Sequence, residues 1–126
     1  MRQMSVLVVD DEPGIRELIS DALSERGCAV SCAENGVEAV ARVAESHPDI
    51  VFLDIRMPKG DGITALREIH KLWPELPVIL ITGGADPAIL KNAFQIGASA
   101  CLIKPFSIND IAHMLDAYAP QLADAA

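Results

Sequence analysis

The sequence predicts an α/β domain in which a doubly wound, five-stranded parallel sheet is covered on both faces by five helices. Three observations carry this prediction. Short apolar runs alternate five times with longer segments whose apolar residues recur at helical spacing. The loops between them are short, so each crossover is right-handed. The composition is 51% hydrophobic but only 4% aromatic, which suits a core of Val, Ile, Leu and Ala. We expect one domain over residues 1–126, with a small-residue tail from about 119.

The first half of the chain supplies two strand–helix units. The apolar run Met4–Val9 predicts a strand, and Pro13–Gly27 predicts a helix with proline near its start and glycine at its end. Cys28–Cys32 is short and tolerates a β-strand. A second helix is predicted over Asn35–Ser46. Its predicted inward face consists of Val37, Val40, Ala41 and Ala44.

The central strand is the continuous apolar run that starts at Val51 and reaches Asp54. Such a run, bounded by prolines on both sides, is typical of a strand covered on both faces. Asp61 then caps a helix that carries Ile63, Leu66 and Ile69 and is ended by Pro74 and Pro77.

The last part of the chain repeats the pattern twice. Val78–Ile81 predicts a strand, and Asp86-Pro87 opens a helix that closes at Gly97. A fifth strand is predicted over Ala100–Ile103, and Ser107 caps a final helix. The inward side of the helix after Asp86-Pro87 is predicted to hold Ile89, Leu90, Ala93 and Phe94.

Charge and composition exclude several classes of function. The net charge of −8 and the pI near 4.7 oppose direct binding of nucleic acid by this chain. No apolar stretch approaches a membrane span, so we expect a cytoplasmic protein without a membrane contact. Neither a dinucleotide fingerprint nor a P-loop is present. The three cysteines and three histidines lack ligand spacing, which disfavours a transition-metal site.

Four of the five predicted strands end in polar residues at the same edge of the sheet. Asp10 with Asp11 follows the first strand, and Asp54, Thr82 and Lys104 follow the third, fourth and fifth. One such ending reflects the turn preference of Asp, but four equivalent endings do not. The carboxyl ends of the strands are where open α/β sheets place reacting groups.

These residue types suit phosphoryl transfer onto an aspartate. Three carboxylates meeting at one edge repel each other by about 4 kcal/mol for each close pair, so they need a cation. Hard oxygen ligands favour Mg²⁺, with Mn²⁺ as a substitute. Lys104 adds an ammonium and Thr82 a hydroxyl. Separately, each residue has an ordinary explanation: an Asp capping a helix, a β-branched strand end, a solvated lysine.

Taken together, the motifs resemble the receiver domain of two-component response regulators. They are the Asp10-Asp11 pair, Asp54 within FLDIRMPKGDG, Thr82-Gly83, and Lys104-Pro105 within LIKPF. The resemblance covers essentially the whole chain. It implies a flavodoxin-like sheet with strand order 2-1-3-4-5. It also implies a signalling phosphoacceptor that catalyses its own phosphorylation and dephosphorylation, rather than an enzyme acting on a separate substrate.

The resemblance assigns roles to the acidic residues. Asp54 would take the phosphoryl group from the phosphohistidine of a sensor histidine kinase or a phosphotransfer protein. Asp11 and Asp54 would bind Mg²⁺ directly, and Asp10 at least through water. The backbone carbonyl of Arg56 would complete the protein's share of the metal shell.

The remaining two residues would respond to the phosphoryl group. Lys104 would pair with Asp54 and then with the phosphate, and Thr82 would turn its hydroxyl to a phosphoryl oxygen. The Lys104-Pro105 bond is similar to one that is cis in the family. Phosphorylation would then bias a face formed by the fourth helix, fifth strand and last helix. That face includes Ile89, Lys91, Asn92, Ile96 and Ala112, and would bind a downstream protein or a second copy.

Cys101 departs from the family, which usually has Tyr or Phe three residues before the lysine. It leaves open a non-switching pseudo-receiver that serves only as an interaction module. A receiver fragment of a longer DNA-binding transcriptional regulator is a further alternative. A hydrolase with an Asp nucleophile is disfavoured, because Arg56 stands where such enzymes typically carry an acid–base Asp. Arg56 and Gly84 occupy the variable positions that tune the lifetime of the phosphoryl group.

Overall fold

The computed structural model describes residues 3–57, 62–84 and 87–119. Within these residues five strands and five helices alternate, beginning with a strand. The strands are β1 (Ser5–Val9), β2 (Ala29–Ala33), β3 (Ile50–Asp54), β4 (Val78–Thr82) and β5 (Ala100–Ile103). The helices are α1 (Pro13–Glu25), α2 (Gly36–Ser46), α3 (Gly62–Leu72), α4 (Pro87–Ile96) and α5 (Ile108–Tyr118). Within the described residues, no helix is long and apolar enough to cross a membrane.

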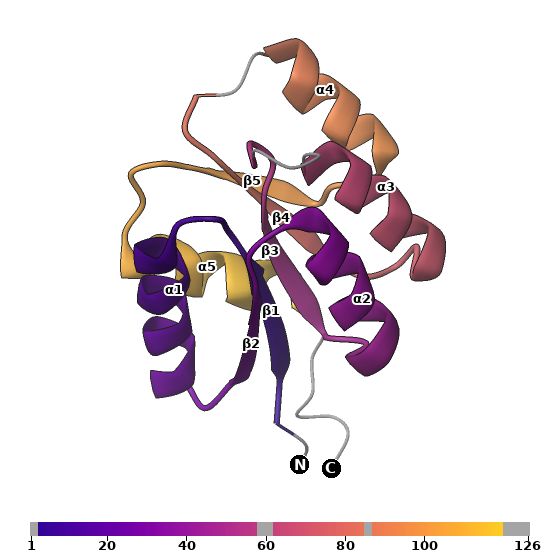
Figure 1. The fold of residues 1–126 in the computed structure, drawn as a ribbon. Coiled ribbons are helices and arrows are strands. Elements are labelled where there is room, and N and C mark those ends of the chain that lie inside the picture. The colour runs from indigo at the N-terminus through magenta and orange to yellow at the C-terminus, as the bar shows by residue number, and fades with distance from the viewer. Residues whose placement is uncertain (1–2, 58–61, 85–86, 120–126) are drawn as a thin grey trace.

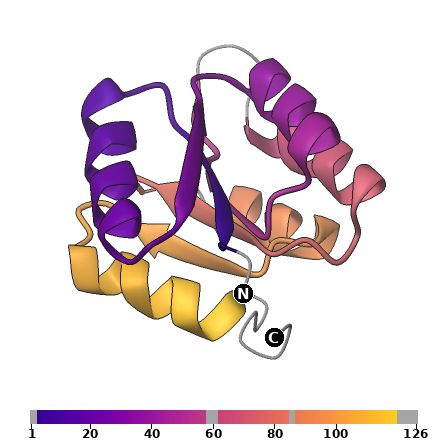
Figure 2. The ribbon, with the colours of Figure 1, turned by 90° about the horizontal axis from the view of Figure 1, so that it is seen from below.

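All neighbouring strands are parallel, and their order across the sheet is β2-β1-β3-β4-β5. This is the doubly wound, flavodoxin-like fold that the sequence predicts. Helices α1 and α5 cover one face of the sheet, while α2, α3 and α4 cover the other (Figures 1 and 2). Strand β3 is the middle strand of this order and is buried at every residue, so its carboxyl end lies at the middle of one edge of the sheet.

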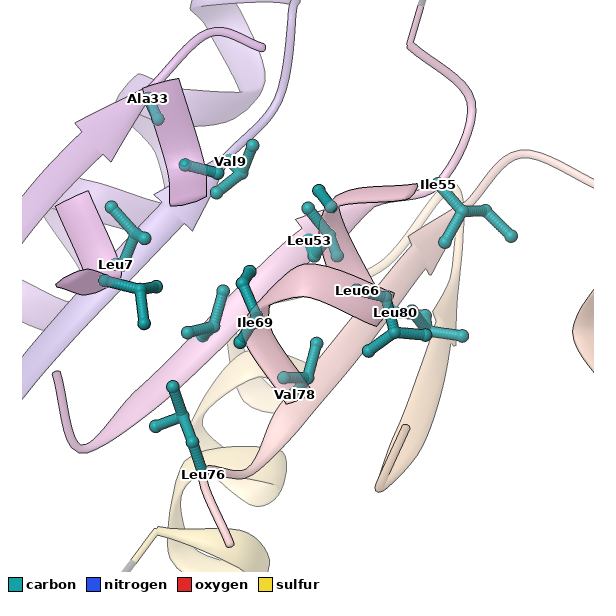
Figure 3. Close-up of a cluster of buried hydrophobic side chains, with 14 of the residues drawn as sticks. Leu7, Val9, Ala33, Leu53, Ile55, Leu66, Ile69, Leu76, Val78 and Leu80 are labelled. Atoms are coloured by element: carbon teal, nitrogen blue, oxygen red, sulfur yellow. The ribbon is translucent and has the colours of Figure 1, made fainter. Parts of the chain in front are cut away.

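Successive strand residues point to opposite faces and build two separate cores. Leu7, Leu53 and Leu80 belong to the core under α2 and α3, together with Leu66 and Ile69 from α3 (Figure 3). The second core lies under α1 and α5. It includes Val6, Val8, Phe52, Ile79, Ile19 and Ile111. Both cores consist of apolar side chains, and the buried polar residues Asp10, Asp54 and Thr82 lie at the ends of strands.

The predicted inward face of α2 is wrong at Val37, Ala41 and Ala44, which are exposed, and right at Val40, which packs against the core. Val37 is 80% exposed, and the buried residues of this helix are Gly36, Ala39 and Val43. Asn35 accepts a hydrogen bond from the Glu38 backbone N–H at 2.8 Å and caps the helix. The error arises because small residues occur all round α2, so an apolar stripe rotated by about one residue fits the sequence equally well.

Two residues that were predicted to face inward on α4 are also exposed. Ile89 is 42% and Phe94 is 44% exposed, whereas Ala93 is fully buried and Leu90 is half-buried. A helix that packs through one alanine presents only a narrow apolar stripe to its neighbours. The predicted cap Asp61 lies outside the described residues, as does Asp86, which was predicted to open α4 together with Pro87. The predicted cap of α5 is confirmed, since Ser107 and Asp110 form a capping box.

Candidate functional site

The carboxyl edge of the sheet brings three of the predicted residues together. Asp10 directly follows β1, Asp54 is the last residue of β3, and Lys104 directly follows β5. The Lys104 Nζ lies 3.4 Å from Asp10 Oδ2 and 3.7 Å from Asp54 Oδ2. The Lys104 ammonium thus lies between two carboxylates that are 44 residues apart in the chain. They meet because the carboxyl ends of parallel strands lie at the same edge of the sheet.

Asp10 is fully buried at this edge. Its Oδ1 accepts a hydrogen bond from the Glu12 backbone N–H at 2.9 Å. Among the described residues, its Oδ2 has no hydrogen-bond partner. Burial raises the pKa of the Asp10 carboxyl, although the hydrogen bond from Glu12 and the charge of Lys104 oppose the shift. Lys104 lies 3.4 Å from this oxygen but makes no hydrogen bond to it, and the pKa stays raised, so a further cation at Asp10 Oδ2 would lower the energy of the site.

Asp54 is also almost fully buried, with 3% of its surface exposed. Its Oδ1 accepts a hydrogen bond from the Arg56 backbone N–H at 2.9 Å. Burial raises the pKa of Asp54 to about 6, against the opposing effects of that hydrogen bond and of Lys104, and the nearby Asp10 charge adds to the increase. The carboxyl therefore ionises near neutral pH.

The backbone fixes where Lys104 emerges. Its N–H donates to the Thr82 carbonyl at 2.7 Å, and the Lys104-Pro105 bond is cis, as the family resemblance implies. Burial lowers the pKa of Lys104, but the hydrogen bond to Glu12 and the charges of Asp10 and Asp54 outweigh it and raise the pKa overall. Lys104 is therefore fully charged at neutral pH.

Thr82 ends the strand next to Asp54 and is 1% exposed. Gly83 and Gly84 follow it, and Gly84 has a φ of 108°, a conformation that favours glycine. The structure thus places Thr82 at the same edge, with a pair of glycines leading the chain toward α4.

Glu12 is a site residue that the sequence reasoning missed. Its Oε1 forms the shortest contact of Lys104 Nζ among the three carboxylates, at 2.8 Å. The signal was present, because a third acidic residue directly follows the Asp10-Asp11 pair.

The donor set fits a hard divalent cation. Carboxylate oxygens of Asp10, Asp11 and Glu12 lie within 4.8 Å of one another, and Asp11 and Glu12 are exposed. Asp54 is not part of this group of three carboxylates, but Lys104 contacts both Asp54 and Asp10. Oxygen-only ligands and the unbonded Asp10 Oδ2 suit Mg²⁺. The predicted ligand set of Asp10, Asp11, Asp54 and the Arg56 carbonyl remains a proposal.

The model of the response regulator receiver domain family matches residues 6–116 of this chain. The chain belongs to this family. Receiver domains are signalling phosphoacceptors that interact with histidine kinases or phosphotransfer partners, and they typically bind Mg²⁺ at an acidic pocket. The match includes every residue of the site described above.

Receiver relatives occur both as short proteins and within long ones. The chain is 37% identical over 107 residues to the chemotaxis protein CheY of Bacillus subtilis, covering 84% of this chain and 89% of that protein. It is 41% identical over 106 residues to the regulatory protein AtoC of Escherichia coli, covering 84% of this chain but 23% of that protein. The DNA-binding transcriptional regulator NtrC of Salmonella typhimurium is 38% identical, with 92% and 25% covered. The chain thus spans about a quarter of the long relatives.

Solved receiver structures have the same fold. The receiver domain of NtrX from Brucella abortus superposes with a TM-score of 0.84 at 35% identity, covering 90% of this chain and 96% of that one. CheY4 of Vibrio cholerae superposes with a TM-score of 0.88 at 26% identity, covering 93% and 99%.

Proposed function

We propose that this receiver domain accepts a phosphoryl group on Asp54 from the phosphohistidine of a sensor histidine kinase or phosphotransfer protein. The observation that carries the proposal is the position of Lys104, whose ammonium lies 3.4 Å from Asp10 and 3.7 Å from Asp54 at the carboxyl edge of the sheet. A carboxylate nucleophile beside a fixed ammonium and an acidic cluster is suited to phosphoryl transfer, which depends on positioning and charge neutralisation.

In the proposed transfer, an Asp54 oxygen bonds to phosphorus while the phosphorus–nitrogen bond to the donor histidine breaks. The imidazole leaves and an aspartyl phosphate forms. In the later hydrolysis, a water oxygen bonds to phosphorus while the bond between phosphorus and the Asp54 oxygen breaks, which releases inorganic phosphate and restores the Asp54 carboxylate. Mg²⁺, when held by Asp10, Asp11, Asp54 and the Arg56 carbonyl, would neutralise phosphoryl charge. The Lys104 ammonium would neutralise a further part of that charge.

The Arg56 backbone N–H orients the Asp54 carboxylate by its hydrogen bond to Oδ1, which leaves Oδ2 free of that bond and facing Lys104. Thr82, one strand away, would donate its hydroxyl to a phosphoryl oxygen. That donation would draw the Gly83-Gly84 turn toward the site and so change the surface of α4.

A surface hollow beside Lys104 gives the donor protein a place to dock. Its volume is about 390 Å³, and its lining is mostly apolar. The lining residues are Ile15, Leu18, Gly83, Lys104, Pro105 and Phe106. An apolar contact of this kind would bring a phosphohistidine up to Asp54 while excluding water.

The proposed output face combines α4, β5 and α5. Ile89, Phe94, Ile103 and Ile108 are large apolar side chains exposed on these elements. Exposed apolar surface beside a switching site suits a downstream protein or a second copy. The DNA-binding transcriptional regulator NtrC is about four times longer than the region that this chain matches. The second candidate is therefore that this chain is the receiver part of a longer, DNA-binding regulator.

The deciding experiment measures intact mass after incubation with acetyl phosphate and Mg²⁺, beside samples with EDTA and with Asp54→Asn. We expect a metal-dependent gain of one phosphoryl group that the substitution abolishes. No gain, together with no Mg²⁺-dependent binding of beryllofluoride, would establish a pseudo-receiver. Beryllofluoride binding without a mass gain would instead indicate rapid self-hydrolysis.

A further inference from the structure

Glu12 stands at the start of α1 but does not cap it. The residue occupies the N-cap position with extended backbone angles, and its side chain makes no capping hydrogen bond. Ser, Thr, Asp and Asn are the residues that cap helices well. A glutamate here therefore has a carboxylate free for a different contact.

That contact is with Lys104, 92 residues further along the chain. Glu12 Oε1 and Lys104 Nζ are 2.8 Å apart, a charge-assisted hydrogen bond. The backbone of Glu12 is held in turn by Asp10, whose Oδ1 accepts its N–H at 2.9 Å. The buried carboxylate of Asp10 thus fixes the backbone of Glu12, and this places the exposed Glu12 carboxylate beside the Lys104 ammonium.

The ammonium is shared unequally among its three carboxylates. It lies 2.8 Å from Glu12, 3.4 Å from Asp10 and 3.7 Å from Asp54. Only the contact with Glu12 is a hydrogen bond of ordinary length. The Lys104 side chain is 21% exposed and its backbone is fixed by the bond to Thr82, so the head group can move between these partners without moving the strand.

We infer that Glu12 is a positioning residue that holds the Lys104 ammonium away from Asp54 before phosphorylation. The inference rests on the proposed phosphorylation of Asp54. For Lys104 to reach phosphoryl oxygens on Asp54, its head group must loosen the bond to Glu12. Glu12 therefore sets part of the barrier to phosphoryl uptake, and the receiver starts from a restrained state.

Glu12→Gln and Glu12→Asp test this directly. Glutamine removes the charge, while aspartate keeps the charge but is one methylene too short to reach Lys104 in its present position. We expect both variants to take up phosphoryl from acetyl phosphate about two- to fivefold faster at saturating Mg²⁺, as the strength of a partly exposed ion pair implies. Glu17→Gln, an exposed carboxylate one turn into α1, is the matched control and should keep the original rate.

A Lys104→Met background separates positioning from simple charge repulsion. If Glu12 acts through the lysine, Glu12→Gln has no effect on uptake in that background. Acceleration by Glu12→Gln that persists there, or a Glu12→Asp variant that behaves like the original protein, would overturn the inference in favour of plain charge repulsion.

A structural readout covers the case in which Lys104→Met abolishes uptake altogether. In a crystal structure of metal-free Glu12→Gln, we expect the Lys104 Nζ to lie closer to Asp54 Oδ2 than 3.7 Å. An unmoved ammonium would refute the inference. The failure of the proposed function looks different, because the original protein itself would then gain no phosphoryl group.

Discussion

Gly62 packs its Cα directly against the backbone of Asp54. A Cβ at Gly62 would collide with the Asp54 carbonyl oxygen and with the Ile55 Cα. The Gly62 N–H also donates to the Ile55 carbonyl at 3.3 Å. Helix α3 therefore begins immediately behind the candidate site, and only glycine allows this approach.

Gly62→Ala should destabilise the fold. The added methyl meets backbone atoms that cannot rotate away, so we expect a loss of about 2 kcal/mol or more in the free energy of unfolding. Urea denaturation measures it. Gly14→Ala in α1 is the matched control: its Cβ would meet nothing within 4 Å, and alanine should stabilise the helix by up to about 1 kcal/mol. Equal stability of Gly62→Ala and the original protein would contradict the packing described.

The pKa of Asp54 makes stability depend on pH. The folded-state pKa is about 6, above the ordinary value of 3.8, so the folded protein binds the proton more tightly than the unfolded chain. The resulting stability is fully present below about pH 4 and is lost as the pH rises through 6. Asp10, whose pKa is also raised, acts in the same direction.

We therefore expect Asp54→Asn to be more stable than the original protein at neutral pH in EDTA. The difference should be on the order of 2–3 kcal/mol and should shrink to near zero as the pH falls to about 4. Urea unfolding at a series of pH values measures it. A difference that stays constant with pH would mean that Asp54 ionises normally.

Mg²⁺ should stabilise the fold, and more so at higher pH. Binding to the folded state alone raises the melting temperature. Asp10 and Asp54 must lose their protons to bind a cation, so the rise should be smaller at about pH 5 than above pH 7. Thermal melts with Mg²⁺ and with EDTA measure this. Asp11→Asn should weaken the effect, while Asp21→Asn, an exposed carboxylate on α1, should leave it unchanged.

The sequence was sufficient to predict that four polar side chains at the ends of strands lie at one edge of the sheet. Each of Asp10, Asp54, Thr82 and Lys104 follows or ends an apolar run, and parallel topology sends all four to one edge. Glu12 was missed for a physical reason. Its place over Lys104 depends on the turn that Asp10 organises after β1, and hydrophobic periodicity carries no information about that turn.

Helix orientation was the less predictable part of the fold. Strand residues alternate with a period of two, so the runs in β3 and β4 could be assigned without choosing a face. A helix such as α2, with alanine and valine on several sides, leaves the buried stripe undecided until its neighbours are placed. Packing against β1 and α3 selects Ala39 and Val43.

The orientation of α2 leads to opposite expectations for two valines in the same helix. Val43 is fully buried and belongs to the core under α2 and α3, so Val43→Ala should lower the free energy of unfolding by about 2 kcal/mol. Val37 is 80% exposed, and Val37→Ala should change it by less than about 0.5 kcal/mol. Urea denaturation of both variants measures the difference. A larger loss at Val37 than at Val43 would restore the face first predicted from the sequence, since the same methyl groups are removed from the same helix in each case.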